Sequence, residues 1–283
     1  MLDATTILAI LLLCALIIAS WRDLQVREVP DLVSLGLVVT GVLGAIAIAI
    51  IERNPGILYA SATGAAIGFG AGWLLYRARQ WGGGDVKLLA GVGAIIGLWT
   101  PDYRLLAYII LLALAGAVWG LAYSAWLVWR HRVVFRRAFT ARIREPTIHR
   151  ARTILVGCGI VGLLALFVTP LWAQVGILFA LVGAYLLFYT WLVSRTLESK
   201  VLTRALAVAR LMEGDWIVED VRKGRQLIAP ARKTGATVDD LAALRRARVK
   251  TVAVREGIPF VPAFLLAVIL LLVLEARGFV PFF

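Results

Sequence analysis

The stretch GGGDVKLLAGVGAIIGLW, residues 82–99, places a carboxylate at the mouth of a long apolar run. Its glycines and Asp85 separate a polar, basic segment at 77–80 from the apolar residues that follow. An ionisable side chain at the end of a membrane helix is costly, and it marks a candidate functional residue whose partner must be sought. We infer that the partner is Asp23, which closes the first apolar run of the chain in the same way.

The composition predicts a membrane protein. The 283 residues are 61% hydrophobic, and the mean hydropathy of +0.88 lies beyond the usual range of a soluble domain. Apolar runs of about 20 residues recur along the chain, each long enough to cross a bilayer. The predicted spans lie at residues 2–20, 32–51, 57–76, 85–99, 105–129, 153–171, 173–194 and 258–276. The predicted fold class is an all-α polytopic membrane protein of about eight transmembrane helices, with a small α+β cytoplasmic module.

The first and fourth runs have unusual ends. Only Asp3 interrupts the first run, and Trp21-Arg22-Asp23 follows it in place of a small-residue cleavage site. We therefore expect a spanning helix there and not a cleaved signal peptide. The fourth run is short, as expected if the glycine-rich segment before it already lies inside the protein at the depth of the membrane.

The distribution of positive charge predicts the topology. The net charge is +13, and 27 of the 30 Lys and Arg residues fall in alternate loops. Because positively charged loops stay cytoplasmic, we expect both aspartates at the cytoplasmic face of the cell membrane and both termini outside. The basic excess also attracts anionic membrane lipids. Nucleic-acid binding is not expected, since no groove-reading motif accompanies the charge.

The predicted domain organisation follows the spans. Residues 1–194 form a transmembrane catalytic domain with an Arg-rich cytoplasmic loop at 130–152, residues 195–257 form a cytoplasmic module, and 258–283 form the last transmembrane helix and a short external tail. The Arg-rich loop is typical of a basic helix along the membrane surface, followed by a turn at Glu145-Pro146. In the module, apolar residues at helical spacing predict a helix over 197–212 that ends at Gly214. Further predicted elements are strands at 216–218, 227–228 and 252–254, and a helix over 238–248 that begins after Thr237.

Asp23 and Asp85 together suggest acid–base chemistry. Two carboxylates within hydrogen-bonding distance share one proton, because both cannot ionise cheaply. The ionised member can take a proton from a water molecule while the protonated member polarises a peptide carbonyl, so that an amide is cleaved without a metal or another cofactor. Such a pair titrates as a unit, which leaves open which residue is the acid. Gly82, Gly83 and Gly84 lack a Cβ, so an extended substrate can approach and the backbone can take φ values that other residues avoid.

Structural readings of the same residues stay open. Asp23 is four residues from Arg27 and can form an ion pair with it. Asp85 can act as a helix cap after a flexible glycine turn. Lys87 either neutralises Asp85 or marks the cytoplasmic boundary of the span. Cys14 and Cys158 fall within apolar runs and form no Cys-x-x-Cys pair, so no metal site is expected.

A third segment is predicted to reach the same face of the membrane. Gly257-Ile258-Pro259-Phe260-Val261-Pro262 begins the last span. Pro259 is an ordinary residue for a helix start. Pro262 removes a further backbone donor and can leave a carbonyl free to line a cavity, although a plain helix entry explains the segment equally well.

These motifs together resemble the prepilin peptidase family, the GxGD membrane aspartyl proteases that include archaeal preflagellin peptidases. The resemblance rests on Ser20-x-x-Asp23-x-x-x-Arg27-x-Val29-Pro30, followed by Gly82-x-Gly84-Asp85 and Lys87. The segment from Glu213-Gly214-Asp215-Trp216 to Pro262 also looks like the carboxyl-terminal region of archaeal members.

The resemblance implies that Asp23 and Asp85 are catalytic. It further implies cleavage of the class III leader of type IV pilin-like or archaellin precursors, just after a basic residue and glycine, on the cytoplasmic side. The cysteine-rich domain of bacterial members is missing, so amino-terminal methylation of the product is not expected. Asp31 stands after Pro30 where many members have Asn. Glu28 and Asp31 either attract the basic residues of the leader or form a boundary charge pair.

Three other functions share parts of this pattern. A signal-peptide-peptidase-like intramembrane protease shares Gly-x-Gly-Asp, but its first aspartate lies in mid-chain after a tyrosine. A transporter would place acidic residues at the centre of its spans, and none lies at the centre of the predicted ones. A non-catalytic scaffold for pilus or archaellum assembly is the third alternative. A homo-oligomer is compatible with the sequence.

Overall fold

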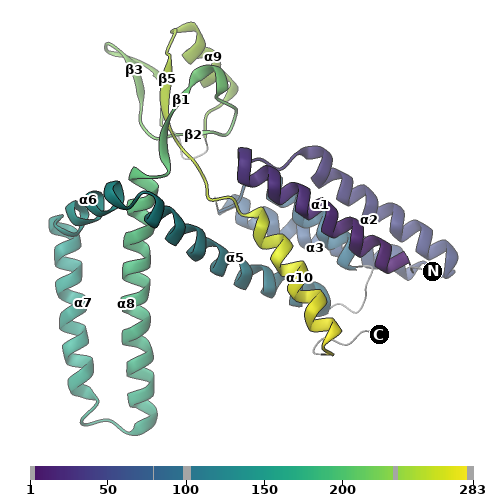
Figure 1. The fold of residues 1–283 in the computed structure, drawn as a ribbon, viewed down its shortest axis with the longest axis horizontal. Coiled ribbons are helices and arrows are strands. Elements are labelled where there is room, and N and C mark those ends of the chain that lie inside the picture. Colours follow the sequence, from purple (N-terminus) through teal and green to yellow (C-terminus); the bar gives the residue numbers. More distant parts are fainter. Residues whose placement is uncertain (1–3, 79, 98–102, 232–234, 279–283) are drawn as a thin grey trace. The chain divides into compact units, whose positions relative to one another are not determined.

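A computed structural model describes residues 4–78, 80–97, 103–231 and 235–278 (Figure 1). Asp3, Arg79, Trp99 and the predicted tail after residue 278 lie outside these described residues. The chain forms two compact units, one of residues 1–122 with 258–283 and one of residues 123–257.

The described residues are mostly helical, which confirms the predicted class of polytopic membrane protein with a small sheet-containing module. Six helices are long and apolar enough to cross a membrane. They are α1 (Ala4–Val26), α2 (Asp31–Ile51), α3 (Gly56–Arg77), α5 (Tyr103–Arg130), α7 (Pro146–Ala165) and α8 (Leu171–Lys200). The other two predicted spans correspond to shorter helices, α4 (Gly83–Ile96) of 14 residues and α10 (Val261–Ala276) of 16 residues.

Helix α1 continues beyond the predicted end of the first span and carries Asp23 in its last turns. The helix ends where Arg27 takes a left-handed conformation with φ 59°, as is common just after a helix terminus. Pro30 then precedes the first turn of α2.

In the first unit, α4 is almost entirely enclosed by protein. Every residue from Leu88 to Ile96 is buried, and α4 packs against α2 and α3. Gly64 and Gly93 face each other so closely that a Cβ on either would strike the backbone carbonyl of the other. The Ser61 hydroxyl donates to the Ala94 carbonyl over 3.0 Å. Small residues allow this backbone-to-backbone approach, which is typical of helices packed in membranes.

Helix α10 joins the same core by packing on α1. Its far end is held to the start of α5 by a buried ion pair, in which Arg104 Nε lies 3.3 Å from Glu275 Oε1. Leaving one member of a buried pair without the other is strongly destabilising. The pair therefore helps to fix α10 along its axis against α5.

The second unit contains a helical hairpin. Helix α6 (Arg132–Ile143) precedes it, which confirms the predicted basic helix, and α6 contacts both α7 and α8. The predicted turn follows at Arg144 and Glu145, and Pro146 occupies the first position of α7, where its missing N–H costs no hydrogen bond. Figure 1 shows α6 running across one end of the α7–α8 hairpin.

The sheet-containing module follows α8. Strands β1 (Thr203–Ala207), β5 (Thr251–Arg255) and β2 (Trp216–Ile217) form an antiparallel sheet in that order, and β3 (Val221–Lys223) pairs with β4 (Gln226–Ala229). Helix α9 (Val238–Arg246) begins after Thr237, whose hydroxyl accepts the Asp240 N–H over 3.3 Å. The predicted strands at 216–218, 227–228 and 252–254 and the cap at Thr237 are confirmed.

The predicted helix over 197–212 is wrong. Helix α8 ends at Lys200, and 203–207 is a strand paired with β5. Leu202 and Leu206 are four residues apart, a spacing that fits one face of a strand as well as one face of a helix. Pairing with β5 satisfies the backbone of this segment and decides between the two. Strand β3 was not predicted, because it is short and two of its three residues are basic.

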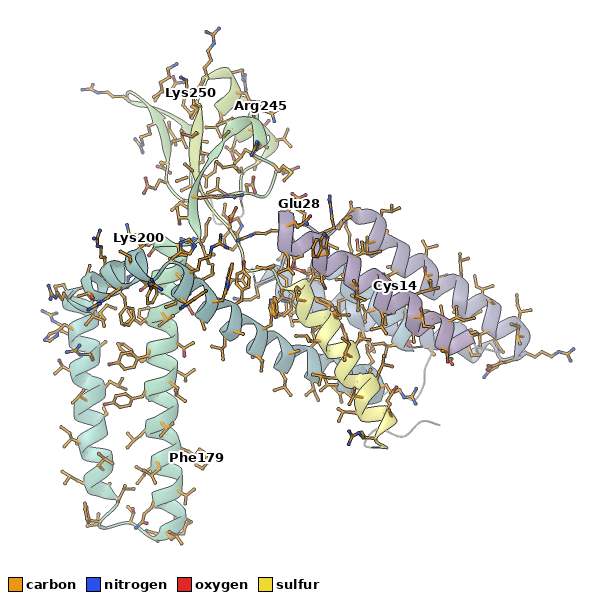
Figure 2. All side chains as sticks on the ribbon, in the orientation of Figure 1. Cys14, Glu28, Phe179, Lys200, Arg245 and Lys250 are labelled. Atoms are coloured by element: carbon orange, nitrogen blue, oxygen red, sulfur yellow. The ribbon has the colours of Figure 1, made fainter. Side chains whose placement is uncertain are left out.

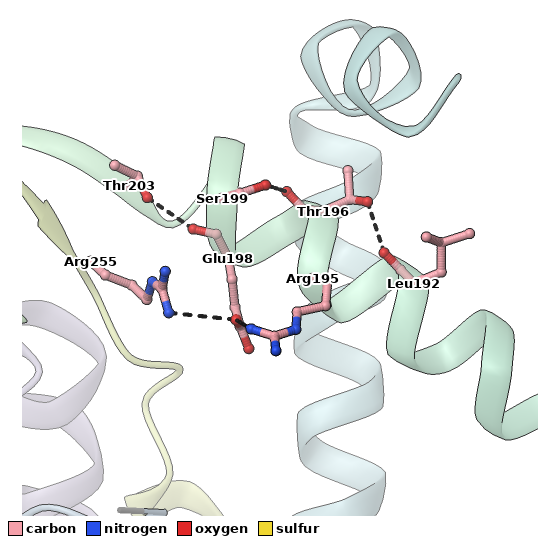
Figure 3. A network of polar contacts seen from close by, with 7 residues as sticks. All are labelled: Leu192, Arg195, Thr196, Glu198, Ser199, Thr203 and Arg255. Carbon is pink, nitrogen blue, oxygen red and sulfur yellow. Dashed lines mark hydrogen bonds and ion pairs between the residues drawn. The ribbon is translucent and has the colours of Figure 1, made fainter. Parts of the chain in front are cut away.

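A polar network joins the end of α8 to the sheet (Figure 3). The Glu198 carboxylate lies between Arg195, at 3.7 Å, and Arg255 of β5, at 3.6 Å. The Thr203 hydroxyl donates to the Glu198 carbonyl over 2.9 Å. The start of the first strand and the end of the last strand are thus both anchored on α8.

The contact between α3 and α4 makes a testable prediction. Gly64→Ala should destabilise the protein by about 1–3 kcal/mol, because the added methyl group meets backbone that cannot rotate away. Gly70→Ala, in the same helix, should be neutral, since nothing lies within 4 Å of a Cβ at that position. Unfolding in mixed detergent micelles measures both changes. Equal stability of the two variants would contradict the close packing.

Candidate functional site

Asp23 is buried where α1 meets the start of α10. Asp23 is only 6% exposed, and its Oδ2 accepts the backbone N–H of Val261 over 2.9 Å. Val261 is the first residue of α10, so this N–H has no partner within its own helix. A helix N-terminus also favours negative charge. Asp23 therefore caps a helix that lies 238 residues further along the chain.

Asp85 lies in the first turn of α4. It is partly buried, and its Oδ2 accepts the Gly82 N–H over 3.0 Å. This hydrogen bond caps the N-terminus of α4, which is the structural role that the sequence analysis left open for Asp85. The negative charge of Asp23 nevertheless acts on the Asp85 carboxyl group. The structure thus places each of the two predicted aspartates at a helix N-terminus, where it accepts a backbone N–H.

The three glycines before Asp85 differ in their surroundings. A Cβ on Gly84 would lie 3.1 Å from the Val29 Cβ, so this glycine lets the loop after α1 approach α4. Gly83 has open space around the Cβ position, and Gly82 meets only the Asp85 carboxylate at 3.7 Å. The expectation that these glycines take φ values avoided by other residues is wrong. Gly82 has φ −83°, and helix α4 already begins at Gly83.

The charged residues near the aspartates have distinct partners. Lys87 Nζ lies 2.7 Å from Asp31 Oδ1, which joins the first turn of α4 to the first residue of α2. Lys87 therefore pairs with Asp31 and not with Asp85. The charge of Arg27 acts on Asp23 from the residue that ends α1. Glu28 is exposed near the end of α1 (Figure 2), and it forms no ion pair with the described residues.

Pro259 and Pro262 are both buried at the start of α10. Pro262 is the second residue of the helix, where a missing N–H is tolerated. The Pro259 carbonyl accepts the indole N–H of Trp119, from α5, over 2.8 Å. Trp119 therefore holds the backbone two residues before the N–H that binds Asp23.

Aromatic rings border the same region, and their contacts with one another were not predicted. The Trp81 ring lies 5.3 Å from that of Phe260 and 5.4 Å from that of Phe264. Gly116 of α5 makes room for Phe260, because a Cβ there would come within 2.6 Å of the ring. Trp81 directly precedes the predicted glycines, and only this position in the sequence pointed to its place near the site.

Within the described part of the chain, no group of three or more His, Cys, Asp or Glu side chains is placed to hold a metal ion. Backbone N–H groups of Val261 and Gly82 donate to Asp23 and Asp85, and the charge of Arg27 acts on Asp23.

The first part of the chain is similar to known peptidases. The profile of the type IV leader peptidase family matches residues 10–125. The chain is 38% identical over 93 residues to a preflagellin peptidase of Methanococcus maripaludis, a match that covers 33% of this chain and 38% of the relative. It is 33% identical over 126 residues to a prepilin leader peptidase/N-methyltransferase of Xanthomonas campestris pv. campestris, covering 42% of this chain and 40% of the relative. The chain thus matches about two fifths of the length of each relative.

No solved structure matches the chain significantly. The family match includes Asp23, the glycines, Asp85 and Trp119. Residues 10–125 of this chain are therefore similar to the type IV leader peptidase family.

Proposed function

We propose that this protein is a membrane aspartyl endopeptidase that removes the leader of type IV pilin-like or archaellin precursors at the cytoplasmic face. The observation that carries the proposal is the placement of Asp23 and Asp85 at two helix N-termini inside the segment that matches the family. The names of the two relatives suggest the class of substrate. The bias of Lys and Arg toward alternate loops supports the cytoplasmic side.

In the proposed mechanism the two carboxyl groups share one proton. The ionised group takes a proton from a bound water, and the water oxygen attacks the peptide carbonyl carbon. The protonated group stabilises the charge that develops on the carbonyl oxygen. When the C–N bond breaks, the leaving nitrogen takes a proton from the pair. The Val261 and Gly82 N–H groups keep the two side chains in place during these steps.

The surroundings of the aspartates suit an extended peptide. Gly82 and Gly83 present backbone without a side chain, so a substrate strand can approach Asp85. Trp81 and Phe260, which are both partly exposed, offer an apolar surface next to it. We assign the apolar residues of the precursor to this aromatic surface and its basic residues to Glu28 in the loop after α1.

Asp23→Asn and Asp85→Asn should each reduce cleavage of a prepilin-like precursor by about 10²-fold or more, because each removes a proton-transfer group. Asparagine keeps an oxygen that can accept the Val261 or Gly82 N–H, so both variants should fold. Asp239→Asn is the matched control, since Asp239 is exposed in α9. The mass of the purified product in detergent measures cleavage. Turnover that persists in either site variant, or fails in the folded control, would refute the assignment.

Glu28→Gln should lower kcat/KM about three- to tenfold for a precursor with a basic leader, and the loss should shrink in high salt. Glu28 is the residue of choice because Lys87 already engages Asp31. A leader with its basic residue changed to Gln should show little further loss with the variant enzyme. Additive losses in this double-mutant cycle would mean that Glu28 does not contact the leader.

Trp119→Phe should lower kcat about tenfold with little change in KM, because the Pro259 carbonyl loses its donor and the Val261 N–H moves away from Asp23. Deuterium exchange at Val261 should accelerate in the same variant. Trp126→Phe, two turns further along α5, is the control. If exchange rises while kcat is unchanged, Trp119 supports only the fold, and the roles of the two aspartates are unaffected.

A further inference from the structure

A groove opens where α5 ends and α6 begins. Helix α5 stops at Arg130 and α6 starts at Arg132, so the chain turns within one residue. The cavity beside this turn measures about 530 Å³. We call it the corner groove, and it is lined by Val128, Arg132, Val133, Phe135, Arg136 and Phe139.

The lining of the corner groove combines two chemistries. Four of its side chains are apolar, and the Phe135 and Phe139 rings stack with centroids 5.4 Å apart. The other two are Arg132 and Arg136, one helical turn apart and therefore on the same side of α6. A ligand that matches both features carries an anionic group next to a hydrocarbon chain.

The two arginines are not neutralised by the protein. Both are exposed, and neither forms an ion pair with a residue that the structure describes. The nearby Arg142, by contrast, lies 3.9 Å from Glu145. Glu145 is also the one acidic residue among the eight arginines of residues 130–152. The groove therefore carries positive charge that a bound anion can neutralise.

The position of α6 indicates that this ligand is a membrane lipid. Helix α6 contacts α7 and α8 and crosses one end of their hairpin (Figure 1). Both hairpin helices are long and apolar enough to span a membrane, so this end lies at the boundary between hydrocarbon and head groups. Amphipathic basic helices at that depth direct apolar side chains toward acyl chains and cations toward phosphates.

We propose that the corner groove binds an anionic phospholipid of the leaflet next to α6. The planar guanidinium groups of Arg132 and Arg136 hold the phosphate, a geometry that suits arginine better than lysine. Val128, Val133, Phe135 and Phe139 receive the adjoining part of an acyl chain. Binding fixes α6, and with it the end of the hairpin, to one leaflet. This role is independent of peptide cleavage.

Native mass spectrometry of the full-length protein in detergent tests the site. The probe is dioleoylphosphatidylglycerol, with dioleoylphosphatidylcholine as the neutral comparison. The wild type should bind the first phosphatidylglycerol at least about tenfold more tightly than phosphatidylcholine, and Arg132→Gln/Arg136→Gln should lose this preference, since the two cations attract the anionic head group. Glycerol 3-phosphate at equal concentration should not displace the lipid, because it cannot use the apolar lining.

The matched control is Arg144→Gln/Arg150→Gln, which removes the same charge from the same segment outside the corner groove. Its affinity for phosphatidylglycerol should change less than about threefold. Thermal unfolding verifies that both double variants are folded. An equal loss in both variants would mean diffuse attraction to charge, and unchanged affinity after the groove substitutions would mean that lipid binds elsewhere. Displacement by glycerol 3-phosphate would mean a simple anion site. Each of these results overturns the proposal.

Discussion

The hydrogen bond from the Val261 N–H to Asp23 is the constraint on which the first unit depends. A carboxylate that is taken out of water must receive hydrogen bonds, or its burial is prohibitively costly. Here the donor is the open end of α10, and α10 must therefore start at one residue and in one place. Trp119 fixes that start through Pro259, and the buried pair of Arg104 and Glu275 fixes the other end.

The other aspartate is placed by close packing of backbones. Helix α4 is short and nearly all buried, and its contact with α3 allows no side chain at Gly64 or Gly93. Gly84 likewise brings the loop after α1 against the start of α4. The close contacts at these glycines therefore fix the position of α4, and with it Asp85. Lys87 and Asp31 add an ion pair at the surface. A rigid frame of this kind suits acid–base groups, whose separation must stay constant.

The sequence was sufficient for features that depend on composition and local pattern. It predicted the membrane class, the basic helix α6 and the cap at Thr237, because hydropathy, basic residues and capping motifs are visible in neighbouring residues. It could not predict Val261 as the donor, since a backbone N–H has no sequence signature. Trp119 is one of ten tryptophans, and nothing local distinguishes it. The helix expected over 197–212 was wrong because the spacing of Leu202 and Leu206 suits a strand equally well.

The order of elements along the chain has a consequence for biogenesis. The ribosome delivers Asp23 with the first span, whereas Val261 emerges only with the last helix, 238 residues later. Throughout insertion the early carboxylate must remain hydrated or be satisfied by a temporary donor. A nascent chain interrupted before α10 would carry both aspartates and the glycines without the helix end that holds Asp23. Assembly of the site thus has to wait until α10 has been translated.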